Sequence, residues 1–261
     1  MKKVAISLVT MWSAYTNNSL KTFFESDINN KNLYDCTLYI FINSLNNSMG
    51  REDKINAEIL EMQKKYDFKI VKLSSINNEG ITGPRISIMN EILKTNAEYF
   101  LEIHDDMIFT NDFFREMIKV FDVDKKYKIV MPALIYVDNL MTEKSEDIKA
   151  RGRQGRILTE SLVQSHPWLI KMELIKSVGY FDPVFSPQSA EDDDFYKRVY
   201  DAGYVPVHTS MSIVGHKNGE TRTRTNLPYS DYNRLFESKH KMTIRNFQLN
   251  IIDKNKKEIK Y

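Results

Sequence analysis

Acidic and histidine side chains stand at the ends of several apolar runs in this sequence. In the run YFLEIHDDMIF, His104, Asp105 and Asp106 follow residues typical of a buried strand. Carboxylate oxygens at such a strand end can bind Mg²⁺ or Mn²⁺ together with the phosphates of a nucleotide. Two aspartates after a strand also commonly form a turn, and TNDFFREMIKVF predicts a following helix with Thr110 or Asn111 as its cap. The pair alone fits both interpretations.

A second acidic group is the run EDDD, Glu191 to Asp194, within SAEDDDFYKRVYDAGY. The pattern predicts a helix with Ser189 near its start and Gly203 after its end. Acidic side chains are favourable in the first turn of a helix, which explains part of the run. A carboxylate at a helix start beside a cleft can also act as a general base, provided that it reaches the hydroxyl group it deprotonates.

Two weaker signals accompany these acids. His216 follows an apolar run and precedes a basic loop, Lys217 to Arg224, so it could bind a metal while the loop approaches phosphate oxygens. The loop NNEGITGPR, with Gly80 before Arg85, opens onto a helix whose backbone amides or arginine could contact an anion. The simpler alternatives are that His216 binds no metal and that NNEGITGPR is an ordinary turn between a strand and a helix.

The elements that must position these residues alternate along the first half of the chain. Short runs rich in β-branched and aromatic residues predict strands, and periodic apolar residues predict helices between them. Alternation of this kind indicates a mostly parallel α/β sheet, in which ligands gather at the carboxyl ends of the strands. The predicted strands are 3–10, 36–43, 68–73 and 99–103, and the predicted helices are 54–65 and 84–94.

The second half is less regular. Residues 128–137 predict another strand, and VPVHTSMSIVGH predicts one or two more. The polar stretch 138–160 has no regular pattern and could form a loop over a site. From Lys239 onward the chain is basic, with apolar residues interleaved, so this tail could cover the domain or touch an anionic membrane surface.

Composition limits the classes of protein that fit. With 261 residues, 42% of them hydrophobic, the chain can bury a large core, and we expect one domain. The 37 basic and 35 acidic residues give a formal charge of only +2, which argues against a nucleic-acid partner. The one cysteine, Cys36, excludes a disulfide within the chain and fits the reducing cytoplasm. No apolar run reaches the roughly 18 residues of a membrane-spanning helix.

In their order and spacing these stretches resemble the GT-A fold glycosyltransferases, in particular the broad family-2-like group that uses sugar nucleotides. The resemblance extends from about Val4 to His216. It implies a Rossmann-like α/β sheet flanked by helices in one domain, 1–238, with a nucleotide-binding half to about 135 and an acceptor half beyond it. Residues 239–261 would form a basic extension.

The resemblance also implies roles for the nucleotide-binding half. VAISLVTMW resembles the opening strand and loop that hold the nucleotide, through Thr10 and Trp12, and NNEGITGPR resembles a loop that ends in an arginine, here Arg85. Where the family usually has an aspartate for the ribose or base, this chain has Asn43 and Ser44.

The metal site and the base are implied in the same way. HDD stands at the place of the family's Asp-any-Asp motif, so Asp106 would bind the metal, His104 replaces the first aspartate, and Asp105 could compensate for it. His216 falls where a histidine often completes the metal site. SVGYFDPVFSPQSAEDDDFYKRVYDAGY resembles the segment with the catalytic acid, and implies Asp192 as the base, with Glu191 or Asp193 as alternatives.

The implied activity is a metal-dependent, inverting transfer of a sugar from a nucleotide diphosphate to a hydroxyl group. The expected cofactor is Mn²⁺ or Mg²⁺, and the expected donor is a UDP-sugar. The expected partner is a glycan, lipid-linked or protein acceptor in surface glycan or polysaccharide biosynthesis. Two alternatives stay open: a nucleotidyltransferase, and a catalytically silent protein that binds nucleotide sugars. The sequence names neither the sugar nor the acceptor.

Overall fold

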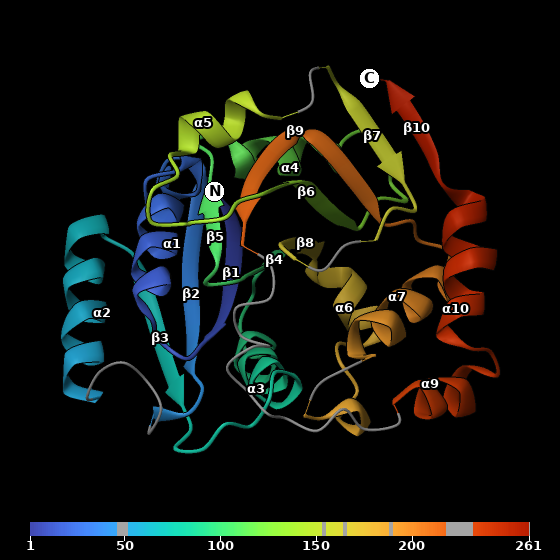
Figure 1. Cartoon of the computed structure of the whole chain (residues 1–261), viewed down its shortest axis with the longest axis horizontal. Coiled ribbons are helices and arrows are strands. Elements are labelled where there is room, and N and C mark those ends of the chain that lie inside the picture. The colour runs from blue at the N-terminus through green and yellow to red at the C-terminus, as the bar shows by residue number, and fades with distance from the viewer. Residues whose placement is uncertain (46–51, 153–154, 164–165, 188–189, 218–231, 261) are drawn as a thin grey trace.

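The structure is a computed structural model, which describes residues 1–45, 52–152, 155–163, 166–187, 190–217 and 232–260. A sheet of ten strands runs through the molecule in the order β10-β7-β9-β6-β8-β4-β1-β2-β3, with β5 paired to β9 (Figure 1). Helices cover both faces of this sheet, so the predicted α/β architecture is confirmed.

The first half of the chain builds a parallel part of the sheet. Its strands are β1 (Lys2–Thr10), β2 (Tyr34–Ile42), β3 (Lys69–Ser74) and β4 (Tyr99–Ile103). They pair side by side in the order β3-β2-β1-β4, and every pairing is parallel. The carboxyl ends of these four strands therefore meet at one edge, as the alternation of strands and helices predicts.

The remaining strands extend the sheet with both directions. They are β5 (Met107–Phe109), β6 (Ile129–Tyr136), β7 (Ile157–Glu160), β8 (Trp168–Lys171), β9 (Val207–His216) and β10 (Lys257–Lys260). Strands β6 and β9 are parallel, whereas β8, β5, β7 and β10 join their neighbours in antiparallel pairs. Residues 205–216 thus contribute a single strand, β9, to the sheet.

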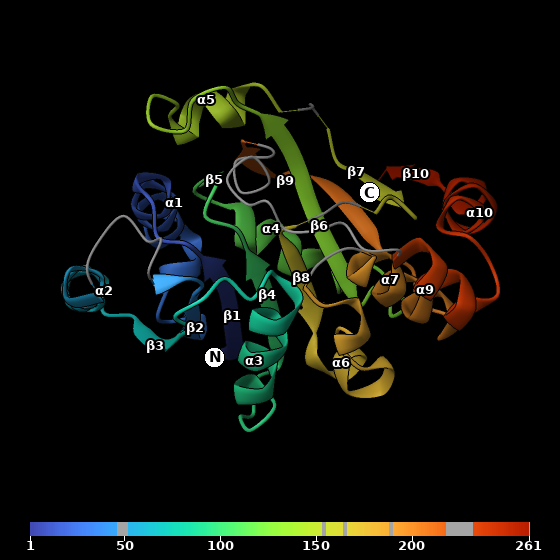
Figure 2. The same cartoon turned by 60° about the horizontal axis from the view of Figure 1, so that its bottom comes forward.

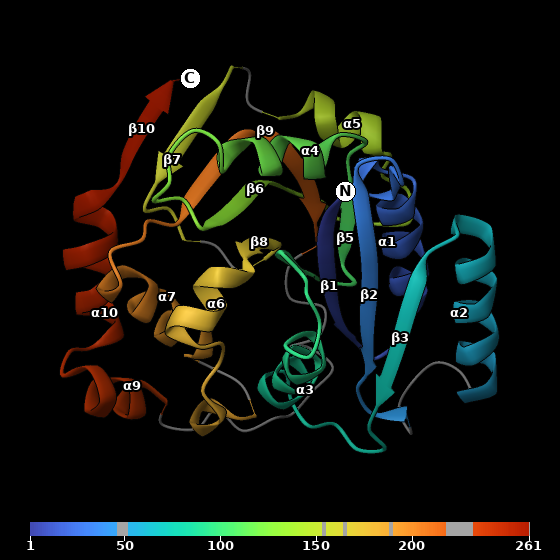
Figure 3. The same cartoon turned by 180° about the vertical axis from the view of Figure 1, so that it is seen from behind.

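Two layers of helices bury the apolar residues of the sheet (Figures 2 and 3). On one face, an aromatic core that includes Phe23, Phe68 and Phe113 packs under α1 (Ala14–Phe24), α2 (Glu52–Tyr66) and α4 (Phe113–Val120). On the other, Trp168 and Phe195 lie in a core under α3 (Thr82–Ile92), α6 (Met172–Val178), α7 (Glu191–Asp201), α9 (Tyr232–His240) and α10 (Ile244–Phe247). Among the described residues, no helix has the length and apolar character needed to cross a bilayer.

The cap of α4 differs from the expectation. Neither Thr110 nor Asn111 caps this helix, because Asp112 occupies the cap position and makes no side-chain cap bond. The carboxylate of Asp27, in the short 3₁₀ turn η1 (Asp27–Asn29), accepts hydrogen bonds from the amides of Phe114 (3.1 Å) and Arg115 (2.7 Å). The capping oxygen comes from a distant part of the sequence, which a local pattern cannot reveal.

Residues 138–160 are not one loop. They contain α5 (Ser145–Ala150) and β7, and Ile148 of α5 is fully buried against Ile213 of β9. A side chain larger than hydrogen at Gly215 would approach Ile148 within 3.0 Å, so this part of the chain packs tightly on the sheet.

The basic C-terminal segment is part of the sheet and its helical layer. Helix α9 crosses the boundary expected at 238/239, and it lies beside α7 (Figure 3). A π-helical turn (Gln248–Asp253) follows α10, and β10 then pairs with β7 at the sheet edge. Ser189 and most of the basic loop, 218–224, lie outside the described residues.

Candidate active site

The pairing of β5 with β9 brings Asp106 and His216 together. Asp106 follows the end of β4, and the next residue, Met107, pairs directly with His216 at the end of β9. The Nε2 atom of His216 lies 3.3 Å from Oδ1 of Asp106, and the amide of Lys217 donates to the Asp106 carbonyl (3.0 Å). The predicted pairing of these two residues, 110 positions apart, is thus built by one rung of the sheet.

The Asp106 and His216 pair keeps unused ligand atoms. Both residues are buried, at 8% and 5% exposure, and neither Asp106 Oδ1 nor His216 Nδ1 has a hydrogen-bond partner among the described residues. Orphaned buried polar atoms are costly, and a bound ion is one of the ways to satisfy them. His104, Asp106 and His216 can place one ligand atom each within 4.8 Å of one another. Carboxylate and imidazole ligands of this kind suit Mn²⁺ and related divalent ions.

His104 is held differently from His216. Nη2 of Arg85 lies 3.0 Å from its Nε2 atom, and because a guanidinium can only donate, Nε2 is the acceptor. The ring proton is then on Nδ1, which faces Oδ1 of Asp106 at 4.0 Å. Burial, then His166 and Arg85, lower the pKa of His104 well below its usual value, so the ring is neutral. In this arrangement the acceptor nitrogen of His104 is already in use.

Asp105 points toward the opening strand. Its carboxylate accepts hydrogen bonds from the hydroxyl groups of Thr10 and, at 3.0 Å, Thr16. Burial raises the pKa of Asp105 to about 6, against the effect of these hydroxyl groups. The ring of Trp12 is buried and donates from Nε1 to Glu58 (2.7 Å). Thr10 and Asp105 thus join the ends of β1 and β4, and their predicted contact with a nucleotide stays a prediction.

Asn43 holds a loop. Its amide donates to Asn78 (3.0 Å) and to the carbonyl of Gly80 (2.6 Å), and its oxygen accepts from the amide of Glu79 (3.0 Å). These bonds use both hydrogens of the side-chain amide. The predicted ribose or base contact would therefore require Asn43 to exchange one of them.

Arg85 lies between the strand ends and the acidic helix. Its side chain is only 3% exposed and forms a buried ion pair with Glu102 of β4. Nη1 also lies 3.6 Å from a carboxylate oxygen of Glu191 and 3.5 Å from Oδ1 of Asp192. Burial opposes the charge of Arg85, but the attraction of Glu102, Asp192 and Glu191 raises its pKa overall.

Asp192 is more accessible than its neighbour Glu191. Its side chain is 30% exposed, compared with 7% for Glu191. The Oδ1 atom of Asp192 has no hydrogen bond among the described residues. Burial and the neighbouring Glu191 raise the pKa of Asp192 well above its usual value. A partly exposed carboxylate with a raised pKa is suited to take a proton.

Two other acids of the run have structural partners. Asp194 is fully buried and binds Arg198 (2.8 Å), Lys239 (2.7 Å) and His240 (2.8 Å), so it joins α7 to α9. Asp193 accepts a hydrogen bond from Gln248 (3.3 Å). The guanidinium of Arg198 also donates to three backbone carbonyls at the end of α6, of residues 178, 179 and 180.

Two residues at the centre of the site, Glu102 and His166, are not among the candidate site residues predicted from the sequence. Glu102 contacts Arg85, His166 (3.2 Å to Nε2) and the hydroxyl group of Tyr180. His166 stacks on Trp168 and lies beside His104, with ring centroids 4.1 and 4.3 Å apart. An acid inside an otherwise apolar strand was the available signal for Glu102, because such a side chain is buried only with a partner.

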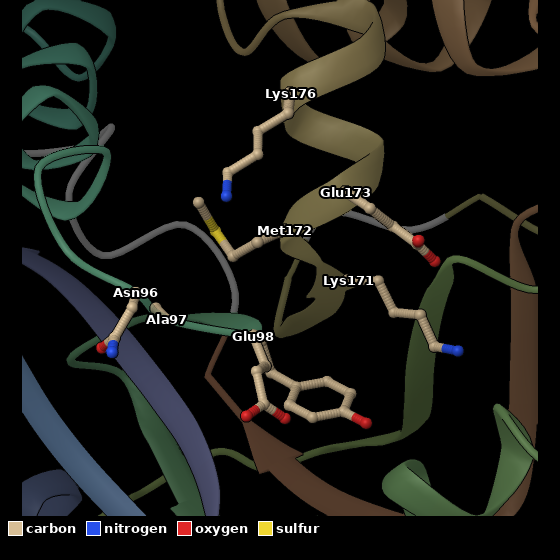
Figure 4. Close-up of a pocket in the computed structure, with 8 residues that line it drawn as sticks. Asn96, Ala97, Glu98, Lys171, Met172, Glu173 and Lys176 are labelled. Carbon is tan, nitrogen blue, oxygen red and sulfur yellow. The ribbon is translucent and has the colours of Figure 1, made fainter.

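A separate pocket lies at the opposite end of β4. It has a volume of about 420 Å³ and is lined by residues of the α3–β4 connection, the end of β8 and α6, including Glu98, Lys171 and Lys176 (Figure 4). Tyr99 begins β4 in this pocket, whereas His104 follows the other end of the strand. Charges of both signs line the pocket, and it is not part of the site described above.

Comparison with solved structures finds glycosyltransferases of the GT-A type. S. aureus TarS 1–349 matches with a TM-score of 0.56 and 13% identity, over 96% of this chain and 75% of that one. The complex of TarS 1–349 with UDP-GlcNAc gives 0.60 and 14%, over 91% and 65%. GalNAc-T7 with UDP, GalNAc and Mn²⁺ gives 0.62 and 11%, over 96% and 56%. No family model and no curated protein sequence matches this chain.

These likenesses establish the fold. The chain has the GT-A fold expected from its sequence, and the matches cover more than nine-tenths of it. It spans between 56% and 75% of the length of the matched chains. At 11–14% identity the similarity is one of architecture, so activity has to be argued from the site.

Proposed function

We propose that this protein is a metal-dependent glycosyltransferase that moves a sugar from a UDP-sugar to a hydroxyl group of an acceptor. The observation that carries the proposal is the pair Asp106 and His216, buried at the strand ends with unused ligand atoms, in a chain with the GT-A fold. The binding of UDP-GlcNAc by TarS, and of UDP and Mn²⁺ by GalNAc-T7, supports the choice of donor and metal.

Asp106 and His216 are the proposed direct ligands of a divalent cation, with Mn²⁺ preferred over Mg²⁺ because an imidazole is a softer ligand than the oxygen ligands that Mg²⁺ takes. Such a cation, when bound, neutralises the charge that develops on the departing nucleotide diphosphate. His104 lies next to these ligands. Since its acceptor nitrogen receives the Arg85 hydrogen bond, we propose that His104 lines the site beside Asp106, with Nδ1 4.0 Å from Oδ1, and is not a direct ligand in this arrangement.

Asp192 is the proposed base. It would accept the proton of the acceptor hydroxyl group as that oxygen attacks the anomeric carbon and the bond to the diphosphate breaks. Its raised pKa makes it a stronger base than an ordinary aspartate. A single base with no protein nucleophile inverts the configuration at the anomeric carbon, and we propose inversion on this ground. The alternative base, Glu191, is less exposed.

The acceptor and the cellular setting are proposed more coarsely. We propose that the acceptor is a precursor of a surface glycan or polysaccharide. Its hydroxyl group would belong to a sugar, a lipid-linked sugar or a protein. A cytoplasmic location, with contact to a membrane through the basic C-terminal segment, stays a prediction from the sequence.

Turnover of UDP-sugars tests the proposal. Wild type and Asp192→Asn are incubated with UDP-GlcNAc, UDP-GalNAc, UDP-glucose or UDP-galactose and Mn²⁺, and the released UDP is measured with and without candidate acceptors. We expect release with one donor, lowered about 10²- to 10⁴-fold by Asp192→Asn because the general base is lost. Nucleotide binding without release in any mixture would instead favour the silent binding protein.

A further inference from the structure

All three nitrogens of the Arg85 guanidinium contact side chains of the protein itself. Nε pairs with Glu102, Nη1 faces Glu191 and Asp192, and Nη2 lies 3.0 Å from His104 Nε2. Nη2 also lies 3.1 Å from Nε2 of a second buried histidine, at position 166. With 3% of the side chain exposed, little of Arg85 is left for a ligand.

These contacts join three elements that carry different parts of the site. Glu102 and His104 belong to β4 and its end, Asp192 belongs to α7, and Arg85 projects from α3 between them. The start of α3 is itself tied to the segment before α7, because the amides of Ile81 and Thr82 donate to the carbonyl of Pro187 (2.8 and 3.1 Å). Arg85 therefore lies at the junction of the proposed metal-binding strand end and the proposed base.

We propose that Arg85 is a positioning residue that fixes Asp192 relative to the His104 end of β4, rather than a nucleotide ligand. The inference rests on the proposed function, because it takes Asp192 to be the base. Through Nη1 the guanidinium holds the base in place and opposes the rise in its pKa, and through Nη2 it sets the ring orientation of His104. One side chain thereby links the end of the site that receives the leaving group to the end that activates the acceptor.

The charges around Asp192 explain why a cation is needed there. Glu191 and Asp193 on its own helix, and Glu102 on β4, all raise its pKa, and among the groups with the largest effects only Arg85 lowers it. Tyr180, whose hydroxyl group donates to Glu102, also faces this cluster and is held protonated by burial and by Glu102. Without Arg85 the carboxylates would share protons, and Asp192 would take up a proton at a higher pH.

The test combines kinetics with a spectroscopic measurement on the full chain. For wild type, Arg85→Lys and Arg85→Ala, UDP release from the accepted UDP-sugar is followed from pH 5 to 9, with and without guanidinium chloride in the low millimolar range. The ¹³C carboxyl resonance of Asp192, assigned by its loss in Asp192→Asn, reports its titration without any turnover. Arg198→Lys is the matched control, since Arg198 also pairs with a buried carboxylate, of Asp194, but does not contact Asp192.

In Arg85→Ala, we expect the acidic limb of the pH profile of kcat to shift to higher pH by about 1–3 units, as for a carboxylate that loses a close positive charge. The Asp192 resonance should move with it, the donor KM should change less than about twofold, and guanidinium should restore the limb. Arg85→Lys should show a partial effect, because it keeps the charge but not the fork of donors. Arg198→Lys should lower the unfolding temperature without moving the limb.

Two results would overturn the inference. One is an unchanged Asp192 titration in folded Arg85→Ala. The other is a donor KM raised more than tenfold with kcat and its pH profile unchanged, the pattern of a nucleotide ligand. If the resonance shifts as expected but wild type turns over no donor, the proposed function fails while the role of Arg85 in holding Asp192 stands.

Discussion

At the scale of single residues, burial decides which acids are available for chemistry. Asp194 and Asp192 stand two positions apart in one run, yet Asp194 is fully buried among Arg198, Lys239 and His240, whereas the Asp192 side chain is 30% exposed and lies 3.5 Å from Arg85. Asp105 and Asp106 differ instead in their partners, since the first accepts hydrogen bonds from two threonines and the second faces His216. Neighbouring carboxylates thus take separate roles because their side chains point to different elements.

Asp27 gives a prediction at this scale for the pH dependence of stability. Burial raises its pKa to about 6 despite the two backbone amides it accepts from. The folded state therefore binds the proton more tightly than the unfolded chain. The contribution of Asp27 to the free energy of unfolding is greatest below about pH 4, falls as the pH rises to about 6, and is constant above that.

Comparison of wild type with Asp27→Asn isolates this effect, because the asparagine does not titrate. The unfolding free energy of wild type minus that of the variant should decrease between pH 4 and pH 6.5, by at most about 3 kcal/mol for a shift of this size. Thermal or urea unfolding at matched ionic strength measures the difference. A difference that stays level or rises with pH would show that the raised pKa is wrong.

At the scale of elements, the junction between α3 and α7 positions the site. Gly80 has a φ of +76°, and a Cβ atom there would lie 2.2 Å from the carbonyl oxygen of Pro187. The same carbonyl accepts the amides that begin α3. Because the glycine allows this close approach, Arg85 can reach Asp192.

Substitution of two glycines of this loop separates the packing effect from helix propensity. Gly80→Ala should lower the free energy of unfolding by roughly 2–4 kcal/mol, because the backbone is strained and must move from Pro187. Gly83→Ala is the matched control. Gly83 lies within α3, and the atom nearest to a Cβ there, a carboxylate oxygen of Glu79, is 3.9 Å away, so the change should be stabilising by about 0.5–1 kcal/mol. Equal effects of the two substitutions in urea unfolding would contradict this account of the junction.

The elements also show what could be predicted from the sequence. The spacing of apolar residues and the local composition predict the four parallel strands and the helices α2 and α3, because these elements depend on local patterns. The cap of α4 by Asp27 and the pairing of β10 with β7 depend on residues far apart in the chain, and no local signal contains them. The same holds for His166, whereas an acid within an apolar strand marks Glu102 as buried but does not reveal that Arg85 is its partner.

At the scale of the whole molecule, the sheet brings residues from both halves of the chain to one edge. The parallel strands β1 to β4 place Thr10, Asp105 and Asp106 there, and the long strand β9 returns from the second half to add His216. On the other side of the sheet, β10 pairs with β7 at the edge, and α9 holds α7 through Asp194 (Figure 3). The GT-A architecture brings the proposed metal ligands and base together from distant parts of the chain.

The most direct test of the central claim is nucleotide binding that depends on a metal and on Asp106. Thermal unfolding is measured with UDP, GDP, CDP and dTDP, each with and without Mn²⁺, for wild type, Asp106→Ala and the exposed control Asp122→Ala. A nucleotide at about 100 times its dissociation constant should add about 2.7 kcal/mol to the folded state. We predict stabilisation by UDP with Mn²⁺, lost in Asp106→Ala and kept in Asp122→Ala. Equal stabilisation of Asp106→Ala, or none by any nucleotide with metal, would contradict the account.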